Sequence, residues 1–138
     1  MKPGILGKSE KFSIIVTEDM VPSFDGEIVH HVMSTVTMIY YMEKVGRYVI
    51  LPYFEEHEEG AGFEINVKHV GPAVIGQTVT FQATCTEVRG KRVICEVTAH
   101  TSENQVGVGI FTQAVFVKQE MAERLSSLQK KVAEGESA

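Results

Sequence analysis

The sequence predicts an α+β fold in which one antiparallel sheet curls around one long central helix. The stretch Ser34–Tyr53 (STVTMIYYMEKVGRYVILPY) is apolar on almost every side when drawn as a helix, and such a helix belongs inside a larger structure. From Gly62 onward the apolar period changes to two, the period of strands. The sheet needs its apolar face covered and the helix needs a cover, so each prediction supports the other.

The composition is that of one globular domain spanning residues 1–138. Hydrophobic residues make up 43% of the chain and charged residues 22%, as is usual for such a domain. The formal net charge of −5 argues against a nucleic-acid or membrane partner. No apolar run approaches the roughly 20 residues of a membrane span, and the N-terminal segment lacks the apolar core of a signal peptide. We therefore expect a cytoplasmic protein.

The two cysteines, Cys85 and Cys95, are too few for a disulfide scaffold. The chain has no CxxC motif and no His/Cys spacing typical of a metal site. We expect two reduced core cysteines that could lie near each other across a hairpin. No metal and no cofactor are predicted.

The first segments read as a strand and a loop. Lys11–Thr17 is rich in β-branched and aromatic residues, which favours a strand. Glu18–His31 contains Pro22, Gly26 and several acids, which indicates a loop or short helical turn leading into the helix. Loops of this length are often lids.

The central helix has clear limits. Ser34, Thr35 and Thr37 are all competent N-caps, and Pro52 stops the helix. One face carries Val36, Ile39, Tyr40, Glu43 and Arg47, and much of the other carries Met38, Met42, Val45 and Val49.

Four consecutive strands and a helix follow an acidic, solvated loop predicted at Phe54–Gly60. The strands are predicted at Gly62–Val70, Gln77–Val88, Arg92–Thr101 and Gln105–Lys118, the last apolar on both faces as in a central strand. A tight hairpin turn is expected at residues 89–91. One face of each of the first three strands is predicted to carry Phe63, Ile65, Val67 and His69; Val79, Phe81, Ala83 and Cys85; and Val93, Cys95, Val97 and Ala99. Gln119–Ala133 reads as an amphipathic, charged helix, and the last five residues are expected to fray.

A sheet curled around one long helix is the hot-dog arrangement. Such a sheet has a free edge strand, and free edges commonly pair across a dimer axis. The sequence therefore predicts a hot-dog fold that is at least dimeric.

Three residues are candidates for chemistry. Glu43 is an acid in the middle of an apolar helix, and it either has a task, reaches solvent through a gap, or pairs with Arg47 one turn later. His69 lies on an apolar strand face, where a core role and a catalytic role are both open. Thr35 is either an ordinary N-cap or a reactive hydroxyl. A carboxylate, an imidazole and a hydroxyl that meet in one space suffice for acyl transfer.

These residues carry a resemblance to the fluoroacetyl-CoA thioesterase family of the hot-dog superfamily, and the similarity covers most of the chain. The opening MKPGILGKSEKFSIIVTEDMVPS is similar to that family's start. The helix has the family's Thr–x7–Glu pattern as Thr35 and Glu43, and the family's glycine and histidine match Gly62 and His69 at the same spacing. The segment HVGPAVIGQTVTFQATCTEVRGKRVICEVTAH also resembles the family in length and hairpin position.

The resemblance implies a homodimeric acyl-CoA thioesterase, or a tetramer of paired dimers, with its active site at the subunit interface. Thr35, Glu43 and His69 would form the catalytic group, and Gly62 would lie beside the thioester. Two positions depart from the family pattern: Gln113 replaces its arginine on the last strand, and Val29 falls where it has an aromatic gate in a longer lid. The resemblance therefore implies hydrolysis of a small acyl-CoA more firmly than fluoroacetyl selectivity.

One geometric condition applies to this site. Eight residues along a continuous helix separate Thr35 from Glu43 by about 12 Å and roughly 80° of rotation. Both can address one substrate if Thr35 sits near the N-cap with the chain bent inward, or if a partner subunit completes the site. We predict the former.

Other functions are compatible with the same fold. A non-catalytic module that binds acyl-CoA or lipid would show saturable binding without hydrolysis. A hydratase or dehydratase would be expected to carry an Asp/His pairing that the sequence lacks. A purely structural dimer would have a dry, closed space around Glu43.

Overall fold

The computed structural model describes residues 1–135. Its strands are β1 (Ser9–Ile15), β2 (Ser23–Phe24), β3 (Glu27–Ile28), β4 (Glu58–His69), β5 (Thr78–Arg89), β6 (Arg92–His100) and β7 (Gln105–Val117), and its helices are α1 (Thr35–Ile50) and α2 (Lys118–Ala133). Short 3-10 turns lie at Glu18–Met20 and Leu51–Tyr53.

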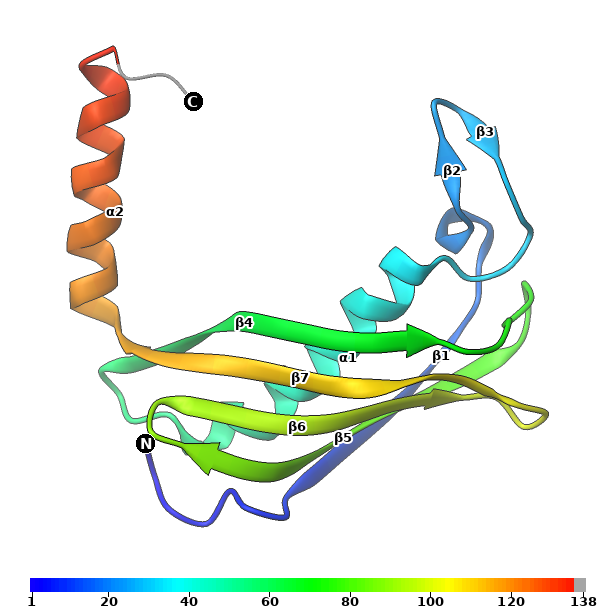
Figure 1. Cartoon of the computed structure of the whole chain (residues 1–138), viewed down its shortest axis with the longest axis horizontal. Coiled ribbons are helices and arrows are strands. Elements are labelled where there is room, and N and C mark those ends of the chain that lie inside the picture. The colour runs from blue at the N-terminus through cyan, green and yellow to red at the C-terminus, as the bar shows by residue number, and fades with distance from the viewer. Residues whose placement is uncertain (136–138) are drawn as a thin grey trace.

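Five strands form one antiparallel sheet in the order β1-β5-β6-β7-β4, and it curves around α1 (Figure 1). The predicted hot-dog arrangement is therefore confirmed. Strands β1 and β4 are the two edges of the sheet. Strand β7 has a neighbour on each side, as predicted, although Val108 and Ile110 on it are 37% and 45% exposed.

The core lies between the concave face of the sheet and one side of α1. The helix contributes Met38, Met42, Val45 and Val49, all at most 2% exposed. The predicted inward residues of β5 and β6 are confirmed as buried: Val79, Phe81, Ala83, Cys85, Val93, Cys95, Val97 and Ala99. Cys85 and Cys95 are reduced and face each other as partners in the β5–β6 register.

Helix α1 is not enclosed on all sides, contrary to the sequence analysis. Val36, Tyr40 and Tyr48 are 76%, 60% and 40% exposed, and Glu43 is exposed with them. A five-stranded sheet covers only one side of a helix. The apolar residues on the other side therefore face outward from this chain.

The loop predicted before α1 contains a hairpin that the sequence analysis missed. Strands β2 and β3 pair around Asp25 and Gly26, which have φ angles of 53° and 82°. Positive φ at both central residues is typical of a type I′ turn, and Asp-Gly is a preferred sequence for it.

Strand β4 is longer than predicted, and one face of it was assigned wrongly. It begins at Glu58 inside the expected acidic loop, where Glu58 pairs with the N-terminal amino group at 2.9 Å. The register with β7 shifts between Gly62 and Glu64, which marks a β-bulge. The bulge turns Phe63 away from the core, so its ring lies 3.9 Å from the Arg92 guanidinium rather than beside Ile65.

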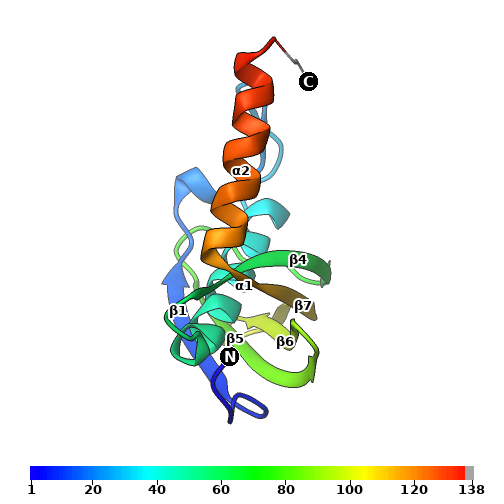
Figure 2. The ribbon, with the colours of Figure 1, turned by 90° about the vertical axis from the view of Figure 1, so that its left-hand side faces the viewer.

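Helix α2 begins directly after β7 and stands away from the sheet, as the two perpendicular views show (Figures 1 and 2). No residue of α2 is buried. Its limits agree with the sequence prediction to within one residue; of the five C-terminal residues expected to fray, 136–138 lie outside the described part of the chain. Within residues 1–135, no helix has both the length and the hydropathy that a membrane span requires.

Candidate active site

The start of α1 presents Thr35 to the end of β4. Ser34 is the N-cap, and its hydroxyl accepts a hydrogen bond from the backbone N–H of Thr37. Thr35 is therefore the first helical residue, and its hydroxyl is not used for capping. Thr35 Oγ1 lies 2.8 Å from Nδ1 of His69, the last residue of β4.

The surroundings of His69 favour its neutral form. Burial lowers the pKa of His69 below 6.5, and a backbone hydrogen bond with Gly71 opposes this only in part. A neutral imidazole has one nitrogen free to accept a proton. The pair can therefore activate a hydroxyl near pH 7.

A hollow of about 600 Å³ opens over this pair. The hairpin side of it is formed by Phe24, Val29 and His30, and the helix side by Thr35 and Val36, with His69 between them. Val29, which the resemblance aligned with an aromatic gate, lines the same space as Thr35 and His69. The β2–β3 hairpin, here termed the lid hairpin, thus forms one wall of this space.

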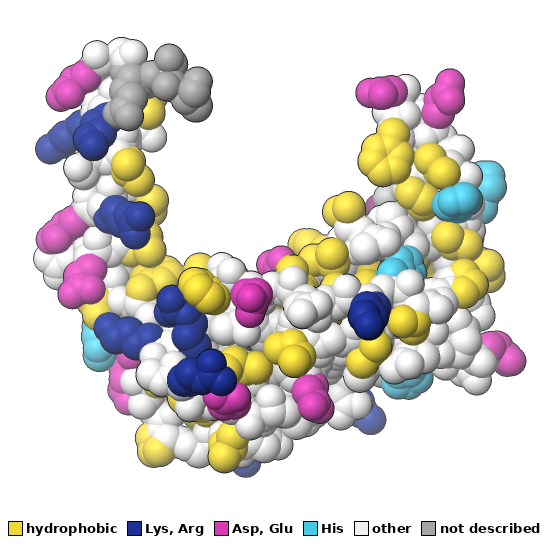
Figure 3. All heavy atoms as spheres, viewed as in Figure 1, with side chains coloured by type: hydrophobic (Ala, Val, Ile, Leu, Met, Phe, Trp, Pro, Cys, Tyr) yellow, Lys and Arg dark blue, Asp and Glu magenta, His cyan; other side chains and the backbone are white. Residues whose placement is uncertain are grey.

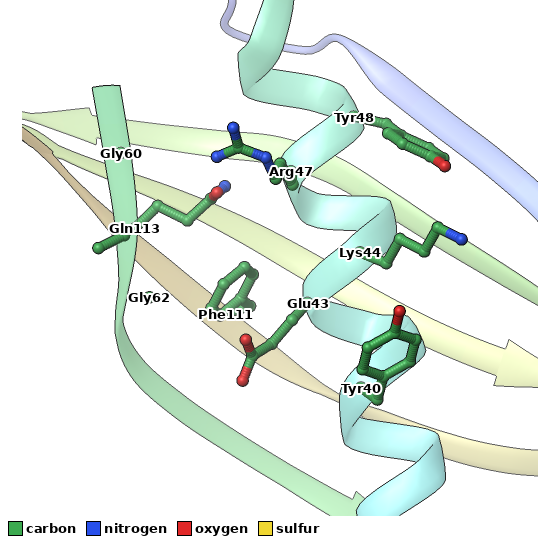
Figure 4. A pocket seen from close by; sticks show the side chains of 10 residues that line it. Tyr40, Glu43, Lys44, Arg47, Tyr48, Gly60, Gly62, Phe111 and Gln113 are labelled. Carbon is green, nitrogen blue, oxygen red and sulfur yellow. The ribbon is translucent and has the colours of Figure 1, made fainter. Parts of the chain in front are cut away.

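Glu43 lies in a second hollow, of about 380 Å³, further along α1. Its carboxylate points into the gap between α1 and β4, towards Phe111 and Gly62 (Figure 4). A Cβ placed on Gly62 would lie 3.8 Å from Glu43 Oε2 and 3.5 Å from the Phe111 ring. The bulge after Gly62 keeps this glycine facing the carboxylate, and bulges often re-aim residues beside active sites.

Arg47 does not pair with Glu43, so one alternative from the sequence analysis is wrong. The two terminal guanidinium nitrogens of Arg47, Nη1 and Nη2, each donate to the Glu59 carboxylate, at 3.1 and 3.0 Å. This bidentate bond is the main reason that the pKa of Glu59 is lowered. Within residues 1–135, Glu43 forms no ion pair. Its carboxylate is thus left open to the hollow.

Gln113 forms part of the wall of the Glu43 hollow. The side chain is 3% exposed, and its Nε2 donates to the Gly46 carbonyl of α1 at 3.0 Å. The resemblance aligned this position with an arginine, and this chain has there a neutral amide that is fixed to the helix. The wall carries no charge at this point.

The structure brings Thr35 and His69 together but leaves Glu43 apart. The helix is continuous from Thr35 to Ile50, so the two residues are separated by about 12 Å along it. Thr35 lies at the helix start, next to the N-cap residue Ser34, as predicted, but it belongs to the same continuous helix as Glu43. No group of three His, Cys, Asp or Glu side chains in residues 1–135 is placed to hold a metal ion.

Comparison with known proteins gives results that agree with this fold. A fluoroacetyl-CoA thioesterase of Streptantibioticus cattleyicolor is 33% identical over 84 residues, which are 61% of this chain and 60% of that protein. The chain is thus matched over less than two thirds of that relative's length.

Two solved structures extend the similarity to most of the chain. A Thermus thermophilus hypothetical protein of the thioesterase superfamily is 33% identical, with a TM-score of 0.90, and the match covers 99% of this chain and 100% of that one. A mutant of the fluoroacetyl-CoA-specific thioesterase FlK, in complex with fluoroacetate and CoA, is 25% identical, with a TM-score of 0.77, over 84% of this chain and 98% of that one.

The family model of the fluoroacetyl-CoA-specific thioesterases matches residues 16–119, which include both hollows and the helix between them. That range is well over half of the 138 residues. The chain therefore belongs to the family of fluoroacetyl-CoA-specific thioesterases.

Proposed function

We propose that this protein hydrolyses a small acyl-CoA thioester to the free acid and CoA, as a homodimer and without a cofactor, in the cytoplasm. The observation that carries the proposal is the Thr35–His69 hydrogen bond under the lid hairpin. Family membership and the similarity to a structure that contains fluoroacetate and CoA support the substrate class.

The free edge of the sheet supports the dimer. Strand β4 has twelve residues, and among residues 1–135 it pairs with β7 alone, so its other edge offers unpaired backbone groups. An antiparallel β4–β4 pairing about a two-fold axis near Ile65 and Asn66 would place Gly62 of the partner subunit opposite His69. Because Gly62 lies beside Glu43, the partner subunit's Glu43 would move towards Thr35 and His69.

A site completed by the partner resolves the separation within one chain. In this arrangement one subunit supplies Thr35 and His69, and the other supplies Glu43 and Gly62. This replaces the expectation that Thr35 reaches Glu43 of its own chain. It also explains why position 62 is a glycine: without a side chain, Gly62 leaves room for the thioester beside the backbone.

Thr35, His69 and the partner subunit's Glu43 would then have separate roles in the reaction. Hydrolysis forms a bond between a water oxygen and the acyl carbon and breaks the C–S bond, and CoA leaves as a thiolate. His69 accepts the proton of Thr35 as the Thr35 oxygen attacks the acyl carbon and the C–S bond breaks. Water then cleaves the resulting acyl–threonine ester, and His69 returns the proton to the Thr35 oxygen. The partner subunit's Glu43 takes the proton of the water. A thiolate is a good leaving group, so strong acid catalysis at sulfur is not required.

The first test is thiol release from a panel of short acyl-CoAs. We expect turnover of acetyl- or similar small acyl-CoA, a loss of about 10²–10⁴-fold in kcat for Glu43→Ala, and little change for the matched control Glu96→Ala. Glu96 is an exposed glutamate on β6, outside both hollows. No turnover with any acyl-CoA, or a fully active Glu43→Ala, would refute the mechanism.

Mixing inactive subunits tests where Glu43 acts. Suppose that each site combines Thr35 of one chain with Glu43 of the other. A heterodimer of one Thr35→Ala subunit and one Glu43→Ala subunit then has one intact site. Random reassociation of the two variants should then restore roughly a quarter of wild-type activity. If both residues act within one chain, the mixture stays inactive.

A non-catalytic acyl-CoA-binding module is the second candidate. The observation that favours it is Gln113, because a wall with an amide in place of an arginine has lost a fixed charge. Saturable binding of acyl-CoA by calorimetry, combined with no thiol release, would establish this candidate instead.

A further inference from the structure

Helix α2 exposes a continuous apolar stripe. Its members are spaced four, three and four residues apart, so they lie on one face of the helix. Leu125, Leu128 and Val132 are 56%, 49% and 58% exposed, and Met121 at the base of the helix is half-buried. A helix of 16 residues standing in water is marginally stable by itself. The stripe therefore needs a surface to pack against.

The lid hairpin has the same property. Phe24, Ile28 and Val29 are 67%, 54% and 53% exposed, and a two-stranded hairpin is also marginal by itself. The space-filling view shows apolar side chains on the inner sides of both projections, with a wide hollow between them (Figure 3). Within one chain the two surfaces face each other without touching.

The topology places these projections at opposite ends of β4. Glu58 at the start of β4 pairs with Val117, the residue before α2, and Lys118 donates to the His57 carbonyl. The other end of β4 is His69, which lies against Thr35 under the hairpin. In an antiparallel pairing of two β4 edges, the Glu58 end of one strand lies beside the His69 end of the other. Helix α2 of one subunit would thus rise beside the hairpin of the other.

Charge also favours this pairing. The hairpin tip carries two exposed acids, Asp25 and Glu27. On α2, Arg124 and Lys131 flank the apolar stripe, because each is three or four residues from Leu128. An acidic apolar hairpin and a basic-flanked apolar stripe are complementary.

We propose that α2 of each subunit packs on the lid hairpin of its partner and holds that lid over the Thr35–His69 pair. The second copy of this chain is thus the occupant of the stripe, and α2 is a positioning element acting in trans. The proposal rests on the dimer of the proposed function but not on any hydrolytic activity.

A disulfide trap tests the placement directly. The double variant Phe24→Cys/Leu128→Cys should form a covalent dimer on oxidation, seen on a non-reducing gel, with the linked peptide identified by mass spectrometry. The matched control is Phe24→Cys/Glu123→Cys, because Glu123 lies on the opposite face of α2, and it should stay uncrosslinked. The native cysteines are buried and reduced, so they do not interfere.

Each other outcome overturns the proposal: a link within one chain, no link, or equal linking in the control. A covalent dimer in a protein that releases no thiol from any acyl-CoA would leave this inference standing while the proposed function fails. A monomeric wild-type protein in sedimentation would remove both the dimer and this inference.

The activity readout is a change in KM. Leu125→Glu/Leu128→Glu should leave the dimer mass unchanged, since neither residue is in the core or on the β4 edge that is proposed to join the subunits. If the lid is then closed only about a tenth of the time, KM should rise about tenfold. The control Glu123→Gln should behave as wild type. An unchanged KM in the double glutamate variant would refute the lid-holding role.

Discussion

The substitution Gly62→Ala separates the role of this glycine in the site from its role in the fold. A Cβ at position 62 meets the Phe111 ring at 3.5 Å and Glu43 Oε2 at 3.8 Å, which are ordinary van der Waals distances. Gly62 is also not among the residues with positive φ. The fold therefore has room for alanine, and the free energy of unfolding should stay the same or rise by up to about 1 kcal/mol through the less flexible unfolded chain.

The same methyl group should harm catalysis. It would occupy the space in front of the Glu43 carboxylate, where the thioester is proposed to lie, and would displace the reacting carbon by about 1 Å. A misplacement of that size can cost about 10²-fold in kcat/KM. Thermal unfolding followed by circular dichroism, together with thiol release, measures both quantities on one preparation.

Gly109→Ala is the matched control for this experiment. A Cβ there would clash with the Asn66 carbonyl oxygen and with Val67 Cα, so β4 and β7 would have to separate. This variant should lose stability on the order of 3 kcal/mol. A stable Gly62→Ala protein with wild-type kcat/KM would refute the placement of the thioester beside Gly62.

Three further predictions follow from the structure. Because burial lowers the pKa of His69 below 6.5, a pH–rate profile should show kcat/KM falling on the acid side through a pKa below 6.5, as the imidazole becomes protonated and can no longer accept the Thr35 proton. Gln113→Leu removes the hydrogen bond to Gly46 but retains most of the side-chain volume, so urea unfolding should show a loss of about 1 kcal/mol. Burial raises the pKa of Cys95 to about 12 and also raises that of Cys85, so both thiols should react with a thiol reagent only after denaturation.

Much of the fold could be predicted from the period of the apolar residues. The inward faces of β5 and β6 were right because no register shift falls between Val79 and Cys85 on β5, and the alternation from Val93 to Ala99 on β6 is unbroken. The face of β4 was wrong at Phe63 because a bulge adds one residue and reverses the alternation. The apolar Phe63 side chain itself gave no sign of this, since its partner, Arg92, comes from a distant strand.

The candidate site was predictable in part. The Thr35–His69 contact joins residues 34 positions apart, and the resemblance indicated it where spacing alone did not. The lid hairpin had a visible signal, the Asp25-Gly26 pair, which was read as part of an irregular loop. The Arg47–Glu59 pair had no visible signal in the sequence. Several acidic residues follow Arg47 along the chain, and only the fold determines which of them it contacts.

The exposed side of α1 shows what an apolar pattern can and cannot indicate. Val36, Tyr40 and Tyr48 led to the prediction of a helix enclosed by its own sheet, and they are exposed in this chain. An apolar pattern indicates that residues are buried in the functional oligomer, but it does not indicate whether their own chain or a partner chain buries them. On the dimer that we propose, the two-fold axis beside β4 brings this side of α1 towards the partner, together with Glu43. The surplus of apolar residues around the acid and the separation of that acid from Thr35 then have one cause, an active site divided between two chains.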